Sequence, residues 1–390
     1  MTKSDDKRVP VLRFKGFTDD WEQRKLGEHI IVSKQKNKDN LSLPAFSISN
    51  KNGFIPQEEQ FGKDNTYSKT DKSSNYIVKP KYFAYNPARI NVGSIAYQNT
   101  ITPVLVSSLY EIFRSDNNID DVFLQYWFRS EYFYKQIQRL QEGGVRQYFF
   151  IDKMRESQIY LTNVSEQNKI GSIISKLDKL LTLQQRKLRQ LKLLKNALLK
   201  RMFTAKKSPT LRFRDFSKDW KLHKLQDITD RLDNARVPVT ASKRIAGSTP
   251  YYGANGIQDY VKGYTHDGEF LLVAEDGANN INDYPVICAK GKIWVNNHAH
   301  VLQAKNKKID ILFLMYALKF LNMKKYLVGG GRSKLNAETM MKLALKLPEL
   351  DEEHNIGVLI KNMDVLITQY KYRIQKINKF KQFLLQNMFI

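Results

Sequence analysis

The sequence contains very little cysteine, since Cys288 is the only one in 390 residues. An intrachain disulfide and a zinc site built from a cysteine cluster are therefore excluded, and a reducing cytoplasm is the expected location. No apolar run reaches the roughly 18 residues that a membrane helix needs, and the N-terminal residues carry no apolar signal region. The sequence predicts no membrane anchor.

Catalytic motifs are also missing. No Gly-x-x-x-x-Gly-Lys-Ser/Thr string is present to hold nucleotide phosphates. The string nearest to the Asn/Asp-Pro-Pro-aromatic loop of amino-methyltransferases is Asn86-Pro87-Ala88-Arg89, which lacks the second proline and the aromatic residue. No proline precedes an aspartate and no Glu-x-Lys occurs, which argues against the commonest two-metal nuclease pattern. We expect no catalytic residue and no ATP-driven motor in this chain.

A metal site is not expected either. His298 and His300 flank Ala299 on a predicted strand, and Cys288 lies ten residues upstream. Alternate residues of a strand share a face, but a metal needs a third or fourth ligand, and none stands at a recognisable spacing. A polar sheet face or a pair of histidines facing DNA are the favoured alternatives.

Acidic residues are outnumbered by basic ones. The chain has 64 Lys and Arg against 39 Asp and Glu, a net charge of +25 and a pI near 9.7. This balance is typical of proteins that bind a polyanion, with DNA or RNA as the first candidate. A merely basic, soluble protein and a protein that docks an acidic partner are the alternatives. Apolar residues make up 42% of the chain, which is enough for two or three domain cores.

Two blocks of sequence occur twice. A Leu-Arg-Phe block with a following Phe, Asp and Trp begins at residue 12 and again at residue 211, 199 positions later. A second block recurs with an offset of 186 positions: Gly143, Gly144, Arg146, Ile170 and Gly171 match Gly329, Gly330, Arg332, Ile356 and Gly357. The frame is duplicated while the residues between have diverged, as expected of two similar but non-identical binding modules.

Two segments have the apolar spacing of a coiled coil. In the first, the seam residues include Ile174, Leu177, Leu181, Leu188, Leu191 and Leu198. In the second, they include Ile360, Met363, Ile367, Ile374, Ile377 and Leu384. Each segment is predicted to form one helix of about 35 residues, and the two can pair with each other. Lys195 and Lys381 fall at matched seam positions, where they either fix the register or turn out to solvent.

The predicted fold is α+β. Two mixed α/β domains are separated by two long helices that pair as an antiparallel coiled coil, with a pseudo-two-fold internal repeat. The predicted boundaries are 1–160 and 206–346 for the mixed domains, and 161–205 and 347–390 for the helical regions. The aromatic residues of the helix near 120–127 are expected to be core residues.

The repeated glycine turns are candidate DNA contacts. Paired glycines let a backbone approach a phosphate, and arginine can bind a phosphate or a guanine edge. The alternative is a turn that needs glycine for its backbone angles alone. The candidate residues in and beside these turns are Arg146, Gln147, Arg332, Ser333 and Lys334.

The chain resembles the DNA-specificity subunit of type I restriction-modification systems. The two Leu-Arg-Phe-x-x-Phe-x-x-Asp-Trp blocks, the Gly247-Ser-Thr-Pro string, Asn86-Pro-Ala-Arg and the two Gly-Gly-x-Arg turns carry this resemblance along essentially the whole chain. It adds Arg89, Tyr251, Tyr252 and Asn255 to the candidate DNA contacts. The first domain lacks a clean Gly-x-Thr-Pro string, so its loops are harder to place.

The resemblance implies a non-catalytic function. It implies that each mixed domain is a target-recognition domain for one half of a split double-stranded DNA target. It also implies two methyltransferase subunits and restriction-translocase subunits as partners. S-adenosylmethionine, ATP and Mg would then be bound by those partners and none by this chain. A self-sufficient DNA methyltransferase and an architectural coiled-coil DNA binder are the alternatives.

Overall fold

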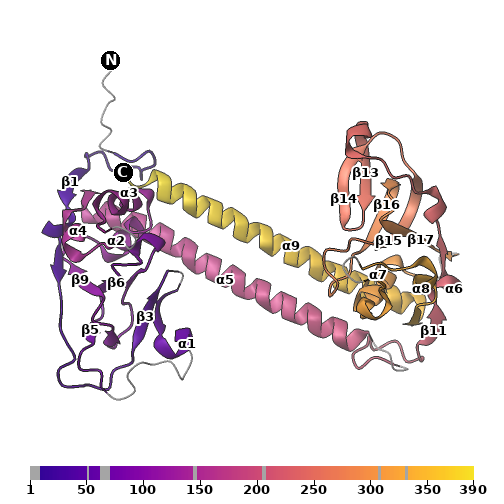
Figure 1. Ribbon diagram of the computed structural model, residues 1–390, viewed down its shortest axis with the longest axis horizontal. Helices are drawn as coiled ribbons and strands as arrows, with labels where there is room; N and C mark the ends of the chain where they lie inside the picture. Colours follow the sequence, from indigo (N-terminus) through magenta and orange to yellow (C-terminus); the bar gives the residue numbers. More distant parts are fainter. Residues whose placement is uncertain are drawn as a thin grey trace. The chain divides into compact units, whose positions relative to one another are not determined.

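The computed structural model describes residues 9–50, 52–61, 71–143, 147–203, 208–305, 309–329 and 333–390. The chain divides into two compact units, which can be followed by colour along the chain in Figure 1. Unit 1 contains residues 1–184 and 373–390, and unit 2 contains residues 185–372. Each unit therefore combines one mixed α/β segment with parts of both long helices.

Unit 1 is built from short antiparallel strands. Its largest sheet has the order β2-β9-β6-β7, and β1-β10, β3-β4 and β5-β8 form separate pairs. The strands are β1 (Glu22–Lys25), β2 (Ile30–Val32), β3 (Phe46–Ser49), β4 (Gly53–Pro56), β5 (Tyr76–Val78), β6 (Phe83–Tyr85), β7 (Ile95–Tyr97), β8 (Val104–Val106), β9 (Glu111–Ser115) and β10 (Gln158–Leu161). The short helices are η1 (Leu26–Glu28), α1 (Gln57–Phe61), η2 (Ile90–Val92), α2 (Asp121–Trp127), α3 (Glu131–Leu140) and α4 (Ile151–Glu156).

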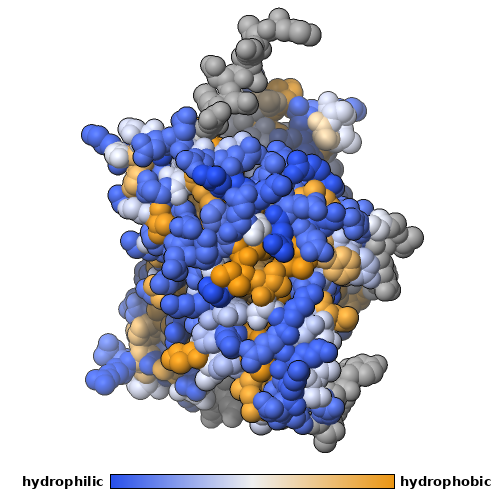
Figure 2. All heavy atoms as spheres, turned by 90° about the vertical axis from the view of Figure 1, so that its left-hand side faces the viewer, coloured by the Kyte–Doolittle hydropathy of each residue, from blue (hydrophilic) through white to orange (hydrophobic). Residues whose placement is uncertain are grey.

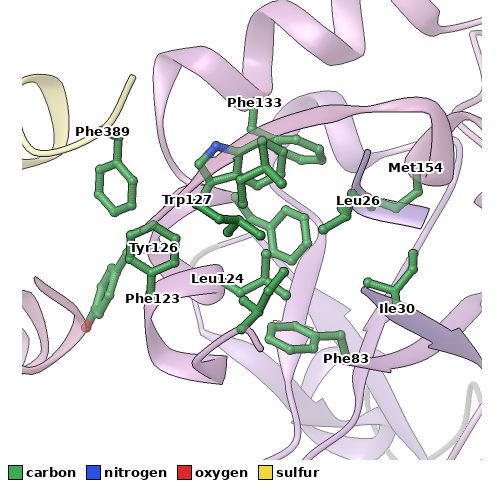
Figure 3. Packing of buried hydrophobic residues seen from close by; sticks show 14 of the residues in the cluster. Leu26, Ile30, Phe83, Phe123, Leu124, Tyr126, Trp127, Phe133, Met154 and Phe389 are labelled. Carbon is green, nitrogen blue, oxygen red and sulfur yellow. The ribbon is translucent and has the colours of Figure 1, made fainter. Parts of the chain in front are cut away.

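Aromatic side chains fill the core of unit 1 (Figure 3). Phe83 stacks on Phe113 with ring centroids 5.2 Å apart, and Trp21 meets the edge of Phe123 at 6.0 Å. Phe389, at the end of the second long helix, packs against Phe123 at 5.1 Å. The prediction that the aromatic residues near 120–127 are core residues is confirmed, since Trp127 is also buried.

Unit 2 has a larger sheet with the order β12-β17-β15-β16-β13-β14, and a separate pair β11-β18. The pairing of β13 with β16 is parallel, and the other pairs are antiparallel. The strands are β11 (Lys221–Lys224), β12 (Thr229–Arg231), β13 (Ala246–Gly253), β14 (Gly256–Val261), β15 (His266–Ala274), β16 (Val286–Val295), β17 (Ala299–Ala304) and β18 (Ala344–Leu347). The short helices are α6 (Leu225–Ile228), η3 (Asp233–Ala235), η4 (Ala241–Lys243), α7 (Ile311–Phe320), η6 (Met323–Tyr326) and α8 (Ala337–Met341).

The core of unit 2 repeats the arrangement of unit 1 around one phenylalanine. Phe313 of α7 stacks on Phe203, just after the first long helix, at 5.2 Å. Trp220 meets the edge of the same ring at 5.7 Å, as Trp21 meets Phe123 in unit 1. The repeated tryptophan therefore has the same packing role in both units.

The repeated Ile-Gly pair marks a close helix contact. A Cβ atom on Gly171 would lie 2.9 Å from the backbone nitrogen of Phe123, and a Cβ on Gly357 would lie 3.0 Å from that of Phe313. Both nitrogens donate at 2.8 Å to the N-cap aspartates, Asp120 and Asp310 respectively. Only glycine lets each long helix approach the start of α2 or α7 this closely, which explains why the glycine is duplicated.

The two long helices are α5 (Val164–Met202) and α9 (Leu350–Asn387), with 39 and 38 residues. Every predicted seam residue is buried or half-buried. In unit 1, Lys381 of α9 pairs with Asp178 of α5; in unit 2, Lys195 of α5 pairs with Asp364 of α9. Residue numbers rise along one helix as they fall along the other, so the pairing is antiparallel.

These contacts confirm the predicted fold class. Both seam lysines form ion pairs, which supports the interpretation that they fix the register rather than turn out to solvent. No helix in the described part of the chain combines the length and apolar character needed to cross a membrane.

Candidate nucleic-acid interface

In unit 2, the turn between β13 and β14 is fastened to the loop that follows β15. Asn255 Nδ2 donates to the carbonyl oxygen of Gly277 at 2.9 Å, and Asn255 Oδ1 accepts from the backbone N–H of Asn279 at 2.9 Å. Asn255 therefore lies at the predicted surface, but its amide group holds two loops together.

The same loop is joined to the hairpin that carries the second glycine-arginine turn. Val328 and Lys334 exchange backbone hydrogen bonds of 2.9 and 2.8 Å at the base of this hairpin. The backbone N–H of Leu335 donates to the carbonyl oxygen of Glu275 at 2.7 Å, and Lys334 Nζ lies 2.9 Å from Glu275 Oε1. Three loops of unit 2 thus converge: the β13–β14 turn, the loop after β15 and the hairpin 328–334.

A buried polar network lies beneath these loops. His300 Nδ1 is 2.7 Å from Asp233 Oδ2, and Arg236 Nη1 donates to Glu275 Oε2 at 2.7 Å. Burial alone would raise the pKa of Asp233, but hydrogen bonds from His300 and the backbone of Val301 lower it overall. Burial likewise opposes the effect of Arg236 and Lys334 on Glu275, whose pKa is also lowered. Both carboxyl groups are therefore held as carboxylates.

Unit 1 builds the same convergence from different residues. Ser94 Oγ donates to the carbonyl oxygen of Ile48 at 2.9 Å, which joins the loop 86–94 to the β3–β4 hairpin. The backbone N–H of Phe149 donates to the carbonyl oxygen of Pro87 at 3.1 Å, which joins that loop to the hairpin 142–148. Phe149 matches Leu335 at the offset of 186 positions. The two glycine turns therefore occupy equivalent places.

The exposed side chains of unit 1 at these loops include a cation and aromatic rings, which are the groups that bind the phosphates and the bases of a nucleic acid. Arg89 is exposed, and its guanidinium forms no hydrogen bond or ion pair with another residue that the structure describes. Tyr148 and Phe150 stack on each other with centroids 5.4 Å apart, and Phe150 is exposed. The face of unit 1 seen in Figure 2 is largely hydrophilic with an apolar patch near its centre. A guanidinium can bind phosphate or a guanine edge, and an exposed aromatic ring can stack on a base.

A cavity of about 480 Å³ opens beside two of the unit 1 loops. Asn50, Asn91 and Gly93 line one side, and the junction between α2 and α3 lines the other. The sequence did not indicate this cavity, because the β3–β4 turn carries no recognisable motif. It is a recess next to the candidate surface of unit 1.

The structure brings five predicted contacts to these surfaces: Arg89, Gln147, Asn255, Ser333 and Lys334. Gly143 and Gly329 have φ angles of 113° and 92°, so each turn does need glycine. Arg146 and Arg332 lie outside the described residues, and their DNA contacts stay predictions.

Tyr251 and Tyr252 do not lie on an open surface. Tyr251 is 1% exposed, its hydroxyl donates to the carbonyl oxygen of Val239 at 3.2 Å, and the Arg244 guanidinium lies 4.1 Å from its ring. Tyr252 is 9% exposed and belongs to an apolar cluster of the sheet. The prediction that these two residues contact DNA is therefore corrected: they support the β13 strand from inside. The sequence could not show that these two adjacent side chains are both buried, on either side of a bulge in the strand.

The two histidines and the cysteine each contact different residues. His298 contacts Asp276, His300 contacts Asp233, and burial raises the pKa of Cys288 to about 12. Cys288 lies beside Met315 and the carbonyl oxygen of Ile311. Within the described ranges, no group of three or more His, Cys, Asp and Glu side chains is arranged to hold a metal.

The sequence matches the family described as type I restriction modification DNA specificity domain over residues 18–193 and 217–379. The chain belongs to this family. The two matched regions correspond to the two repeats, and each runs from the mixed segment into its long helix.

Curated relatives match part of the chain. A putative type I restriction enzyme specificity subunit of Haemophilus influenzae is 41% identical over 151 residues, which cover 39% of this chain and 38% of that protein. A putative type I specificity subunit of Mycoplasma pneumoniae is 26% identical over 161 residues, 40% of this chain and 43% of that protein. The matched stretches thus span less than half the length of these relatives.

Solved structures share the fold over nearly the whole chain. The S subunit of a type I restriction-modification system from M. genitalium superposes with a TM-score of 0.64 over 98% of this chain and 99% of that chain, at 15% identity. A chain from a structure on complex assembly and conformational transition of the type I R-M system gives 0.50 over 96% and 98%, at 13% identity. At these identities the likeness concerns the fold.

Proposed function

We propose that this chain is the DNA-specificity subunit of a type I restriction-modification enzyme. Each unit reads one half of a bipartite double-stranded DNA target through its three converging loops. The observation that carries the proposal is the repeated loop framework with unlike side chains: Arg89 and an aromatic pair in unit 1, a His-Asp-Arg-Glu-Lys network in unit 2. Two similar frames with different surfaces are what recognition of two different half-sites requires.

The net charge supports binding to double-stranded DNA. A charge of +25 favours contact with phosphates, and such contacts position a protein on a duplex without specifying sequence. The loop side chains supply the specific part. The binding should therefore weaken steeply as salt concentration rises, while the preference for one sequence over another persists.

Matched apolar residues on α5 and α9 support docking of two methyltransferase subunits. Leu180 and Phe380 are exposed in unit 1, and Leu366 and Leu194 are exposed in unit 2. Leu180 matches Leu366 and Leu194 matches Phe380 at the offset of 186 positions. Each unit thus presents the same pair of apolar positions, which suits one modification subunit per unit. Restriction-translocase subunits would join the complex through them.

The chain itself carries no chemistry in this proposal. The modification subunits would bind S-adenosylmethionine and methylate one base in each half-site, and the restriction-translocase subunits would use ATP and Mg. The complex would work in the cytoplasm, where the DNA is. The alternatives are a self-sufficient methyltransferase and an architectural DNA binder that needs no partner.

Methyl transfer by purified components separates these possibilities. We expect no transfer to DNA by the chain alone, and transfer at a bipartite motif once the modification subunit is added. Transfer by the rigorously purified chain would identify it as the methyltransferase. Binding without any sequence preference, with or without the modification subunit, would identify an architectural protein.

The docking surface is tested by two double variants. Leu180→Lys with Phe380→Lys should prevent capture of a modification subunit by unit 1, because charged groups replace exposed apolar ones. Gln185→Lys with Gln382→Lys adds the same charge at exposed polar positions on the same helices and serves as the control. Equal binding of the modification subunit by both variants would contradict the assignment.

A further inference from the structure

Equivalent loops of the two units carry different polar side chains. In unit 1, β6 pairs with β7 and β9, and in unit 2, β15 pairs with β16 and β17 in the same arrangement. The loop 86–94 between β6 and β7 is therefore equivalent to the loop 275–285 between β15 and β16. The first loop exposes Arg89, whereas the second exposes three asparagines, Asn279, Asn280 and Asn282.

Hydrogen bonds fix the base of the loop 275–285. The backbone N–H of Ala274 donates to the carbonyl oxygen of Pro285 at 3.0 Å. Tyr284 is buried, and its hydroxyl donates to the carbonyl oxygen of Ala274 at 2.8 Å. The exposed side chains near the tip are thus presented from an ordered base, which lowers the entropy cost of binding a partner.

The four asparagines at this surface of unit 2 differ in what their amide groups contact. Asn255 bonds to the loop through both its side-chain oxygen and its side-chain nitrogen. Asn280 Oδ1 accepts from the backbone N–H groups of Asn282 and Asp283 at 3.0 and 3.2 Å. The side-chain amides of Asn279 and Asn282 form no hydrogen bond with any residue in the described part of the chain. Of the four, these two keep both a free donor and a free acceptor.

The carboxyl groups of the loop are each matched by a basic side chain. The pairs are Glu275 with Arg236 at 2.7 Å, Asp276 with His298 at 2.5 Å and Asp283 with Lys319 at 3.4 Å. A nearby basic group offsets the repulsion between a carboxylate and DNA phosphates. The acidic residues of the loop therefore do not prevent its approach to a duplex.

A free amide with this pair of groups matches adenine. In the major groove, adenine presents N7 as an acceptor and its N6 amino group as a donor, and one asparagine side chain can bind both at once. Guanine presents two acceptors, N7 and O6, which suit an arginine such as Arg89. The loop of unit 2 is thus complementary to adenine, and the equivalent loop of unit 1 to guanine.

We propose that Asn279 and Asn282 are specificity-determining residues, each of which reads one adenine in the half-site of unit 2 through a bidentate contact in the major groove. This role rests on the proposed function and adds the identity of the bases to it. Asn255 positions the loop and contacts no base.

The test replaces each amide with a carboxylate of the same shape. Asn279→Asp and Asn282→Asp keep an acceptor for an amino group but lose the donor for N7, so each variant should favour cytosine, whose edge offers the N4 amino group. The full chain with its modification subunit selects from duplexes randomised at both half-sites, and sequencing of the bound DNA gives the base preferences. We expect the preference for adenine over cytosine to fall about tenfold at one position for each variant, with both positions in the same half.

Asn280→Asp is the matched control. It adds the same charge to the same loop, and its carboxylate still accepts from the two backbone N–H groups that Asn280 Oδ1 binds. Repulsion of phosphates should weaken binding to all sequences equally in the three variants, whereas the base preference should change only in Asn279→Asp and Asn282→Asp. Thermal unfolding at the wild-type temperature in all three variants would show that the loop remains folded.

The outcomes separate this proposal from the proposed function. A wild-type complex that prefers a bipartite sequence, with the same base preferences in Asn279→Asp and Asn282→Asp, would overturn the proposal and leave the proposed function in place. A shift confined to G·C pairs, or an equal shift in Asn280→Asp, would also overturn it. A wild-type complex with no base preference at either half-site would reject the proposed function itself.

Discussion

In unit 1, Arg13 donates to both carboxylate oxygens of Glu166 at 2.7 and 2.9 Å; in unit 2, Arg212 does the same to Glu352 at 2.7 and 2.8 Å. Both glutamates are fully buried. The contacts that attach each mixed segment to its long helix are thus nearly identical. The sheets they support differ, with four strands in the main sheet of unit 1 and six in unit 2.

The comparison teaches which parts of the sequence were free to diverge. Buried contacts that involve both a helix and a globular segment repeat, because a change at one partner leaves a buried polar group unsatisfied. Loops that end in solvent carry no such constraint. Recognition can therefore change in one unit without disturbing the shared frame.

One matched buried position carries different residues in the two units. Gln167 Oε1 accepts from the backbone N–H of Asp120 at 2.9 Å, and Glu353 Oε2 accepts from that of Asp310 at 2.7 Å. Glu353 is 2% exposed, and burial raises its pKa to about 8. At neutral pH it is largely a protonated acid, the closest carboxyl equivalent of the glutamine amide.

The largest expected effect tests whether the close contact of the long helix with α2 in unit 1 and with α7 in unit 2 contributes equally to the stability of each unit. Gly171→Ala and Gly357→Ala should each destabilise their unit by about 3 kcal/mol, because the new Cβ meets the first turn of α2 or α7. Alanine raises helix propensity by about 1 kcal/mol, which the clash must exceed. Urea unfolding followed by hydrogen exchange measures both, with the exposed Ser172→Ala as control. A loss of stability in only one unit would contradict the claim that the two helix contacts are equivalent.

The position of Glu353 should give unit 2 its own pH dependence. The folded pKa of about 8 lies above the ordinary value of 4.5, so the folded state binds more protons, and stability falls as pH rises from about 4.5 to about 8. Glu353→Gln should remove this slope and stabilise unit 2 at pH 9 by on the order of 2 kcal/mol. Gln167→Glu is the matched converse and should introduce the same slope in unit 1. Parallel stability curves for wild type and Glu353→Gln from pH 5 to 9 would refute the assignment.

The two lysine–aspartate pairs should be of similar strength. Lys195→Met and Lys381→Met should each cost about 1 kcal/mol, since the pairs are only partly buried. Each aspartate also accepts from a tyrosine, Tyr316 in unit 2 and Tyr126 in unit 1, and Asp178 lies 3.6 Å from Arg129 as well, so neither aspartate is left without a partner. Exchanging the charges with Lys195→Asp and Asp364→Lys should recover stability that Lys195→Asp alone loses. Thermal unfolding of Lys195→Asp and of the double variant measures this recovery, and no recovery would show that the pair does not set the register.

An effect on DNA binding, and not on stability, is expected at the turns. Arg146→Ala and Arg332→Ala should each weaken DNA binding without changing stability. A phosphate contact would lower the salt slope by about one for any sequence, whereas a base contact would cost about 1 to 3 kcal/mol and relax one half-site. Titrations at three salt concentrations distinguish these outcomes. Unchanged affinity and slope in both variants would reduce the turns to structural elements.

The repeat and the seam spacing predicted much of the fold. Both rely on residue type at fixed intervals, so the helices, their pairing and the glycine turns could be predicted. Asp178 and Asp364 could not be identified as partners of the lysines, because the register of an antiparallel pair is not visible in either helix alone. Packing of each helix end into a globular core also depends on tertiary contacts.

The candidate site was less predictable for a related reason. Tyr251 and Tyr252 have the composition of a base-stacking surface, but burial is decided by which sheet face is covered. His300 is one of two histidines on a strand in the sequence, and only the structure shows that it contacts Asp233 and the carbonyl oxygen of Leu335. Residue type indicates which interactions a side chain can make, and tertiary contacts decide which of them it makes.

The most direct test of the two-surface account is a map of methylated sites for the assembled complex carrying wild type, Arg89→Ala or Lys334→Ala. The account predicts that Arg89→Ala relaxes one half of the bipartite motif, and that Lys334→Ala, which removes the ion pair of Lys334 with Glu275, alters the other half. The spacer should stay unchanged in both. Arg24→Ala and Lys290→Ala, which remove exposed cations from strands of the same units, should leave the motif intact. A variant that changed both halves together, or two variants that changed the same half, would contradict the claim that each unit reads its own half of the target.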